Sequence, residues 1–114
     1  MSARILVVDD LEANRRLLEA KLTSEYYDVL MAQRGEEAVQ LARREKPDLI
    51  LMDVMMPGGI DGYEACRRLK AQAETRHIPV IILTTLDDRD NKVRGLQAGA
   101  EEFLTNPIDD VQLM

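Results

Sequence analysis

Three aspartates in this sequence directly follow short apolar runs. Asp9 and Asp10 come after the run 5–8, and Asp53 comes after the run 49–52. Carboxylates that lie together repel: two unit charges 4 Å apart interact by about 4 kcal/mol at an effective dielectric constant near 20. The repulsion in such a group of carboxylates is relieved by a bound cation, by protonation of a carboxylate or by greater distance between them. Oxygen donors with no histidine or cysteine nearby favour Mg²⁺ over Ca²⁺ or Mn²⁺. A carboxylate beside such a metal can also act as a nucleophile and form an aspartyl phosphate.

Hydroxyl and amide side chains follow two later apolar runs. These are Thr84 and Thr85 after the run 79–83, and Thr105 and Asn106 at the end of the run 103–105. The hydroxyl of Thr84 could donate to a phosphoryl oxygen. A single aspartate often has a simpler role as a helix cap, and Asp10 is suited to cap a helix that begins near Leu11. That explanation is poor for three aspartates at one edge, because buried like charges are costly.

The apolar runs alternate with stretches of helical periodicity. We expect strands at 5–8, 29–32, 49–52, 79–83 and 103–105, and helices at about 11–22, 36–42, 63–69 and 93–100, with a last helix from about 108. Strands that are apolar throughout are typical of a parallel sheet buried on both faces. Right-handed crossovers then predict a doubly wound α/β domain. Ligands bind outside the carboxyl ends of such strands, so we expect the polar residues named above to converge on one edge.

The length and charge of the chain disfavour several classes of protein. A chain of 114 residues makes one domain, and its 15 Lys and Arg against 21 Asp and Glu leave a net charge of −6. That balance disfavours direct binding to nucleic acid, which needs a basic surface. The single cysteine, Cys66, excludes an internal disulfide and suits a reducing compartment. No apolar run is long enough to cross a membrane, so we expect a cytoplasmic protein.

Motifs along almost the whole chain resemble the receiver domains of two-component response regulators. The matching segments are 5–10 (ILVVDD), 48–57 (DLILMDVMMP), 61–63 (DGY), 79–84 (PVIILT), 99–100 (GA) and 103–105 (FLT). Further segments resemble the receivers of PleD-type diguanylate cyclases or DivK-like regulators: 12–14 (EAN), 16–22 (RLLEAKL), 75–79 (TRHIP) and 107–110 (PIDD). The resemblance implies a flavodoxin-like fold with the strand order 2-1-3-4-5. It also implies a signalling switch rather than an enzyme that turns over a metabolite.

The resemblance also assigns roles to residues. Asp53 would accept a phosphoryl group from a histidine kinase or a histidine phosphotransfer protein. Mg²⁺ would be held by Asp10, Asp53 and the backbone carbonyl of Met55, with Asp9 acting through water. Two further positions would form the switch: Thr84 would hydrogen-bond the phosphoryl group, and Phe103 would turn inward on activation. Many receivers form homodimers, which is one assembly that the resemblance allows.

Three departures from the family pattern bear on function. Asn106 stands where the family has a lysine, so the site offers an amide dipole instead of a positive charge. The segment 57–62 (PGGIDG) is one residue longer than usual beside Asp53. The last helix would begin near Ile108, only seven residues from Met114. We therefore expect residues 1–114 to be a receiver truncated within its last helix, with an output domain downstream that could be a diguanylate cyclase.

The sequence also allows other functions to be considered. Because of Asn106, the domain could be a degenerate receiver that serves as a docking or dimerisation module without phosphorylation. A phosphatase with an aspartyl nucleophile carries Asp-x-Asp after its first strand, whereas here Leu11 follows two adjacent aspartates. A dinucleotide-binding domain is disfavoured because no G-x-G-x-x-G follows the first strand. His77 is expected in a surface loop and Cys66 in the core, so neither is assigned to a site.

Overall fold

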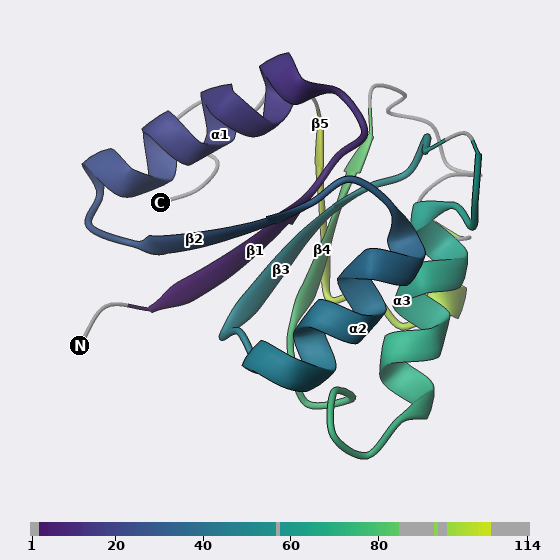
Figure 1. Ribbon diagram of the computed structural model, residues 1–114. Coiled ribbons are helices and arrows are strands. Elements are labelled where there is room, and N and C mark those ends of the chain that lie inside the picture. The colour runs from purple at the N-terminus through teal and green to yellow at the C-terminus, as the bar shows by residue number, and fades with distance from the viewer. Residues whose placement is uncertain (1–2, 57, 85–92, 94–95, 106–114) are drawn as a thin grey trace.

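Five parallel strands form one sheet in the computed structural model, which describes residues 3–56, 58–84, 93 and 96–105. The strands are β1 (Arg4–Val8), β2 (Asp28–Ala32), β3 (Leu49–Asp53), β4 (Val80–Thr84) and β5 (Glu102–Thr105). Their order is β2-β1-β3-β4-β5 (Figure 1), which confirms the predicted doubly wound topology. The register pairs Val8 of β1 with Met52 of β3, and Asp53 with Leu83 of β4. The residues that follow β1 and β3 are therefore neighbours.

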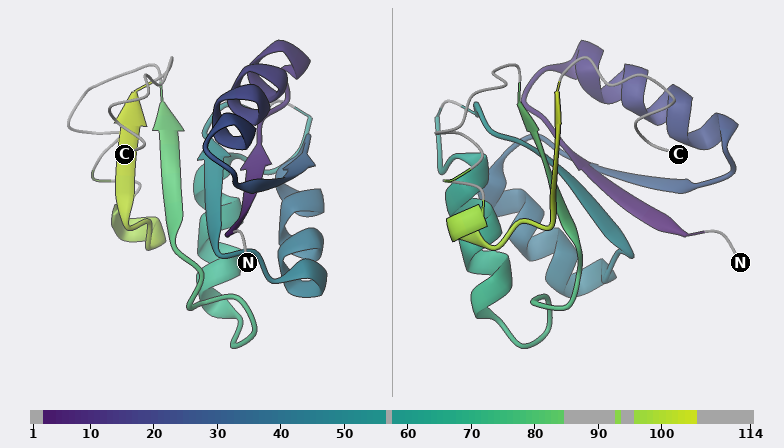
Figure 2. Two further views of the ribbon diagram at one scale, coloured as in Figure 1. Left: turned by 90° about the vertical axis from the view of Figure 1, so that its left-hand side faces the viewer. Right: turned by 180° about the vertical axis from the view of Figure 1, so that it is seen from behind.

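Helices cover both faces of the sheet, as Figure 2 shows. They are α1 (Glu12–Ser24) on one face and α2 (Gly35–Glu45) and α3 (Gly62–Ala71) on the other. Val93 and residues 96–98 are also helical, inside the stretch predicted for the fourth helix. The last predicted helix, Asn106 and Pro107 lie outside the described residues.

Alternate residues of the central strands face opposite layers, and both layers are apolar. One cluster packs Ile5, Val7, Leu51 and Leu83 of the sheet against Leu18 and Leu22 of α1. The other packs Leu6, Val8, Ile50, Met52, Val80 and Ile82 against side chains of α2 and α3, including Ala38, Val39, Ala42, Cys66 and Leu69. This two-sided burial explains why the strands are apolar at every position.

Several local predictions can be compared with the structure. Cys66 is fully buried, as expected, and His77 is exposed in the loop after α3. Gly99 has a left-handed φ of 95°, as expected for the end of a helix. The simpler alternative, in which Asp10 caps the first helix, is not supported: Leu11 is the N-cap residue of α1, and no side chain makes a capping hydrogen bond there. Among the described residues, no helix combines the length and apolar character needed to span a bilayer.

Candidate functional site

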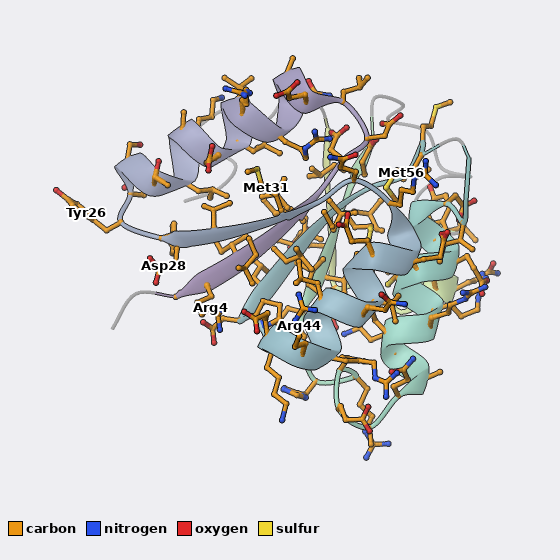
Figure 3. All side chains as sticks on the ribbon, viewed as in Figure 1. Arg4, Tyr26, Asp28, Met31, Arg44 and Met56 are labelled. Atoms are coloured by element: carbon orange, nitrogen blue, oxygen red, sulfur yellow. The ribbon has the colours of Figure 1, made fainter. Side chains whose placement is uncertain are left out.

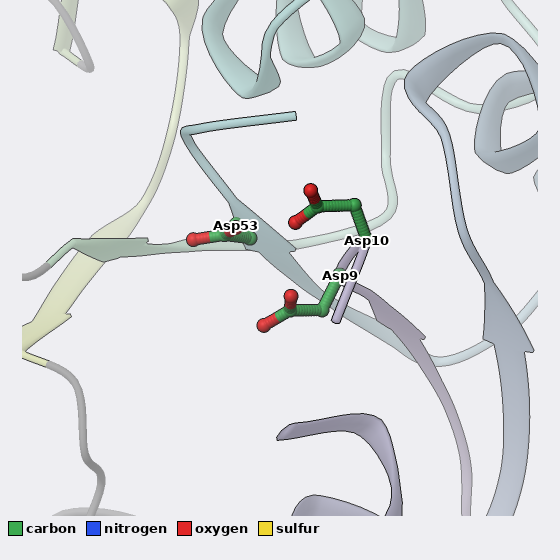
Figure 4. A group of neighbouring side chains, drawn as sticks. All are labelled: Asp9, Asp10 and Asp53. Carbon is green, nitrogen blue, oxygen red and sulfur yellow. The ribbon is translucent and has the colours of Figure 1, made fainter. Parts of the chain in front are cut away.

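Asp9, Asp10 and Asp53 meet at the carboxyl edge of the sheet, and each offers a carboxylate oxygen within 4.8 Å of the others (Figure 4). Asp53 is the last residue of β3, and Asp9 directly follows β1. These strands are paired in the sheet, so the two aspartates come from neighbouring strand ends. The predicted convergence of the three aspartates is therefore confirmed.

Asp9 is fully buried and is held by the first turns of α1. Its Oδ1 accepts a hydrogen bond of 2.9 Å from the backbone N–H of Leu11, and its Oδ2 accepts one of 3.3 Å from Nδ2 of Asn14. Its backbone carbonyl accepts a hydrogen bond of 2.8 Å from the guanidinium of Arg15. Burial raises the pKa of Asp9, while the hydrogen bonds from Leu11 and Asn14 oppose that rise.

Asp53 is the most perturbed carboxyl group of the cluster. Burial, followed by the negative charges of Asp9 and Asp10, raises its pKa from 3.8 to about 7. Hydrogen bonds from the backbone amides of Val54 and Met55 act in the opposite direction. Without a bound cation, the carboxyl group of Asp53 is therefore partly protonated near neutral pH. Perturbed pKa values of this kind are typical of functional sites.

The donor set fits a hard divalent cation. All three ligating groups in the cluster are carboxylates, and a cation between them would relieve the repulsion that raises the pKa of Asp53. Mg²⁺ prefers oxygen ligands and is usually bound by one or two carboxylates, with water and phosphate oxygens completing its shell. The acidic cluster is thus typical of a Mg²⁺ site.

The structure describes the other predicted site residues only in part. Thr84 ends β4, and its backbone pairs with Thr105 of β5, so it lies at the same edge of the sheet. Phe103 lies in β5, opposite Ile82. The side chains of Thr84 and Phe103, and the whole of Asn106, lie outside the described residues. Met55 is exposed in the loop after β3.

Arg15 and Asn14 contact Asp9 and were not predicted as site residues. The sequence does carry a signal for Arg15, which lies on the same helical stripe as Leu11, Leu18 and Leu22 and is only 9% exposed. A charged residue in an otherwise apolar stripe requires a partner, because burying an unpaired charge is costly. That partner is the carbonyl of Asp9, six residues earlier.

Comparisons with known proteins agree with this geometry. The family described as "Response regulator receiver domain" matches residues 5–114. Response regulator PleD of Caulobacter vibrioides is 61% identical over 113 residues, which is 99% of this chain and 25% of PleD. Protein PilH of Pseudomonas aeruginosa is 47% identical over 98% of this chain and 92% of PilH. The chain thus spans about a quarter of PleD and nearly all of PilH.

Solved structures give the same result. A response regulator from Chloroflexus aurantiacus superimposes with a TM-score of 0.93 at 35% identity, covering 99% of this chain and 92% of that chain. The receiver domain of the sensor histidine kinase PA1611 from Pseudomonas aeruginosa superimposes with a TM-score of 0.90 at 36% identity, covering 99% and 92%. That structure is described with a magnesium ion coordinated in the active site cleft.

Proposed function

Because the chain belongs to the response regulator receiver family, we propose that it accepts a phosphoryl group on Asp53 from a phosphohistidine and thereby switches a downstream output. It is a signalling module rather than an enzyme that turns over a metabolite. The observation that carries the proposal is the convergence of Asp9, Asp10 and Asp53, whose carboxylate oxygens lie within 4.8 Å of one another. It is supported by the pKa of Asp53, which burial, followed by the charges of Asp9 and Asp10, raises to about 7.

The transfer is a substitution at phosphorus. An ionised Oδ of Asp53 attacks the phosphorus atom, the P–N bond of the phosphohistidine breaks, and the imidazole nitrogen keeps the electron pair. The product is an acyl phosphate on Asp53, and water later hydrolyses it to the carboxylate and inorganic phosphate. Asp53 must be deprotonated to attack. The neighbours that raise its pKa therefore lower its ionised, reactive fraction until a cation is bound.

In this proposal Asp10, Asp53 and the backbone carbonyl of Met55 would hold Mg²⁺, with Asp9 acting through water. When bound, the ion neutralises the cluster and stabilises the charge on the transferred phosphoryl oxygens. The chain's own residues supply position: the amides of Leu11 and Asn14 orient Asp9, and those of Val54 and Met55 orient Asp53.

The switch proposal concerns residues after β4. Thr84 donates its hydroxyl to a phosphoryl oxygen, Phe103 changes rotamer, and Asn106 occupies the position of the family lysine. Its support is that Thr84 lies on β4, which pairs with the strand that ends in Asp53, and that Phe103 lies on β5, which pairs with β4. Phosphorylation adds about two negative charges, which can bias such a two-state element.

The partners follow from the family. We expect a histidine kinase or a histidine phosphotransfer protein as the donor, and the cytoplasm as the location of this chain. A C-terminal output domain, by resemblance a diguanylate cyclase, would read the switch, and its support is the 25% of PleD that the chain spans. A homodimer is one form in which the active state could act. We propose neither nucleic acid nor membrane as a direct partner, since the net charge is −6.

Intact mass after incubation with acetyl phosphate and Mg²⁺ tests the proposal. The expected result is a gain of one phosphoryl group that disappears in Asp53→Asn. The second candidate, a docking module that is not phosphorylated, is motivated by Asn106. No gain in the parent with a gain in Asn106→Lys would identify a receiver disabled by that residue. No gain in either would refute phosphorylation at Asp53 and favour the docking module.

A further inference from the structure

The loop between β3 and α3, residues 54–61, is tied to the first turn of α2. Oε1 of Glu36 accepts a hydrogen bond of 2.9 Å from the backbone N–H of Ile60, 24 residues later in the chain. Figure 1 shows α2 and α3 side by side on the same face of the sheet, with this loop running to the start of α3. The hydrogen bond from Ile60, together with the charges of Arg68 and Arg34, lowers the pKa of Glu36. Glu36 is therefore ionised near neutral pH.

Two glycines show how closely the loop lies against α2. A Cβ at Gly59 would be 2.7 Å from both carboxylate oxygens of Glu36. A Cβ at Gly35, the first residue of α2, would be 2.6 Å from Cγ1 of Ile60. The contact thus depends on small residues on both sides. Gly59 belongs to the segment that is one residue longer than the family pattern, so the tether acts on the part of the loop that is unusual in this chain.

The other end of the loop forms the phosphoacceptor site. The amides of Val54 and Met55 donate to Asp53, and the carbonyl of Val54 accepts a hydrogen bond of 3.0 Å from the N–H of Gly62. Met56, labelled in Figure 3, is buried in the apolar cluster between the sheet and α2, and Ile60 packs against the same cluster. Among the described residues 58–60, which lie between these anchors, the structure gives one polar contact, the hydrogen bond from Ile60 to Glu36.

We propose that Glu36 is a positioning residue for the acidic site: by holding Ile60 it fixes the lengthened β3–α3 loop, and with it the amides and carbonyl next to Asp53 that receive the metal and the phosphoryl group. This inference rests on the proposed function. It does not make Glu36 a catalytic residue, because Glu36 contacts Ile60 and not the acidic cluster.

The neighbouring residue provides a matched control. Glu37 lies in the same helical turn, and its Oε1 also accepts a backbone hydrogen bond, at 2.7 Å, from the N–H of Gln33. Glu37→Ala removes the same charge and the same kind of hydrogen bond, but its partner precedes α2 and does not belong to the loop. A general effect of charge or helix stability would therefore appear equally in Glu36→Ala and Glu37→Ala.

The experiment compares the whole chain with Glu36→Ala, Glu36→Gln, Gly59→Ala and Glu37→Ala. Mg²⁺ affinity is measured by isothermal titration calorimetry, hydrogen exchange of the Ile60 amide by NMR, and phosphoryl uptake from acetyl phosphate by intact mass. We expect Glu36→Ala and Gly59→Ala to weaken Mg²⁺ binding by about three- to tenfold and to speed exchange at Ile60. Glu36→Gln keeps an acceptor oxygen and should retain most of the affinity, as should Glu37→Ala.

The double variant Glu36→Ala with Gly59→Ala should be no worse than either single change, because both break one contact. Parental Mg²⁺ affinity in Glu36→Ala would overturn the inference, as would an equal loss in Glu37→Ala. Those results would leave the proposed function standing as long as the parent is phosphorylated. A parent that binds no Mg²⁺ and takes up no phosphoryl group would overturn both proposals.

Discussion

Replacing Asp53 with asparagine should stabilise the metal-free domain. Asp53→Asn keeps the size of the side chain and removes the ionisable group that burial, Asp9 and Asp10 destabilise. The folded-state pKa is raised, so the folded protein binds this proton more tightly than the unfolded chain does. The contribution of this bound proton to the free energy of unfolding is fully present below about pH 4 and is lost as the pH rises through about 7.

The magnitude follows from the pKa. A rise from 3.8 to about 7 corresponds to a ceiling of about 4 kcal/mol at alkaline pH. Asp53 is partly exposed to solvent, which screens the repulsion, so we expect about half of that ceiling. About 2 kcal/mol should raise the melting temperature of a domain of this size by roughly 8 °C at pH 8. The advantage of Asp53→Asn should shrink at pH 5.

Urea and thermal unfolding at pH 5 and pH 8, with EDTA present, provide the assay. Asp28→Asn is the matched control, because Asp28 is exposed at the start of β2 and its replacement changes the net charge equally. Adding Mg²⁺ should stabilise the parent and Asp28→Asn more than Asp53→Asn. If Asp53→Asn is no more stable than Asp28→Asn at pH 8, the reasoning from carboxylate repulsion is refuted.

Four further predictions concern the site, the loop after β3 and the core. Mg²⁺ affinity should fall about tenfold between pH 8 and pH 6 in calorimetry, because protons compete for Asp53 as the pH drops through its pKa of about 7; a flat profile would contradict that pKa. Gly62→Ala should cost about 3 kcal/mol or more in urea unfolding, because its Cβ would lie 2.2 Å from the carbonyl oxygen of Asp53. Gly58→Ala, with a φ of 92° and no atom within 4 Å, should cost only about 1 kcal/mol. The Cys66 thiol, buried with its pKa raised to about 11, should resist a thiol reagent at pH 8 until urea unfolds the protein; rapid labelling of the native domain would contradict that burial.

The pattern of the sequence was sufficient to predict the layers of the fold. Apolar strands without alternation indicated a sheet covered on both faces, and the structure places α1 on one face and α2 and α3 on the other. Asp9, Asp10 and Asp53 could be predicted to converge because parallel strands end at one edge. This reasoning needs only the order of the elements along the chain.

The contacts that hold the site were not predictable in the same way. A cap at Asp10 was only the simpler alternative to a metal site, and the structure has Leu11 as the N-cap residue, with the Leu11 amide donating to Asp9. Local preference does not specify which of two adjacent aspartates accepts the Leu11 amide, and the structure shows that Asp9 does so while also contacting Asn14.

Residue types and their periodicity therefore determined the fold class, the position of the acidic cluster and its suitability for Mg²⁺. Only the tertiary structure decided the pKa of Asp53, the partner of Arg15 and the tether from Glu36 to Ile60. The physical reason is the range of the interactions. Periodicity reports the environment of each residue along its own element, whereas desolvation, charge repulsion and a hydrogen bond across 24 residues depend on atoms that only folding brings together.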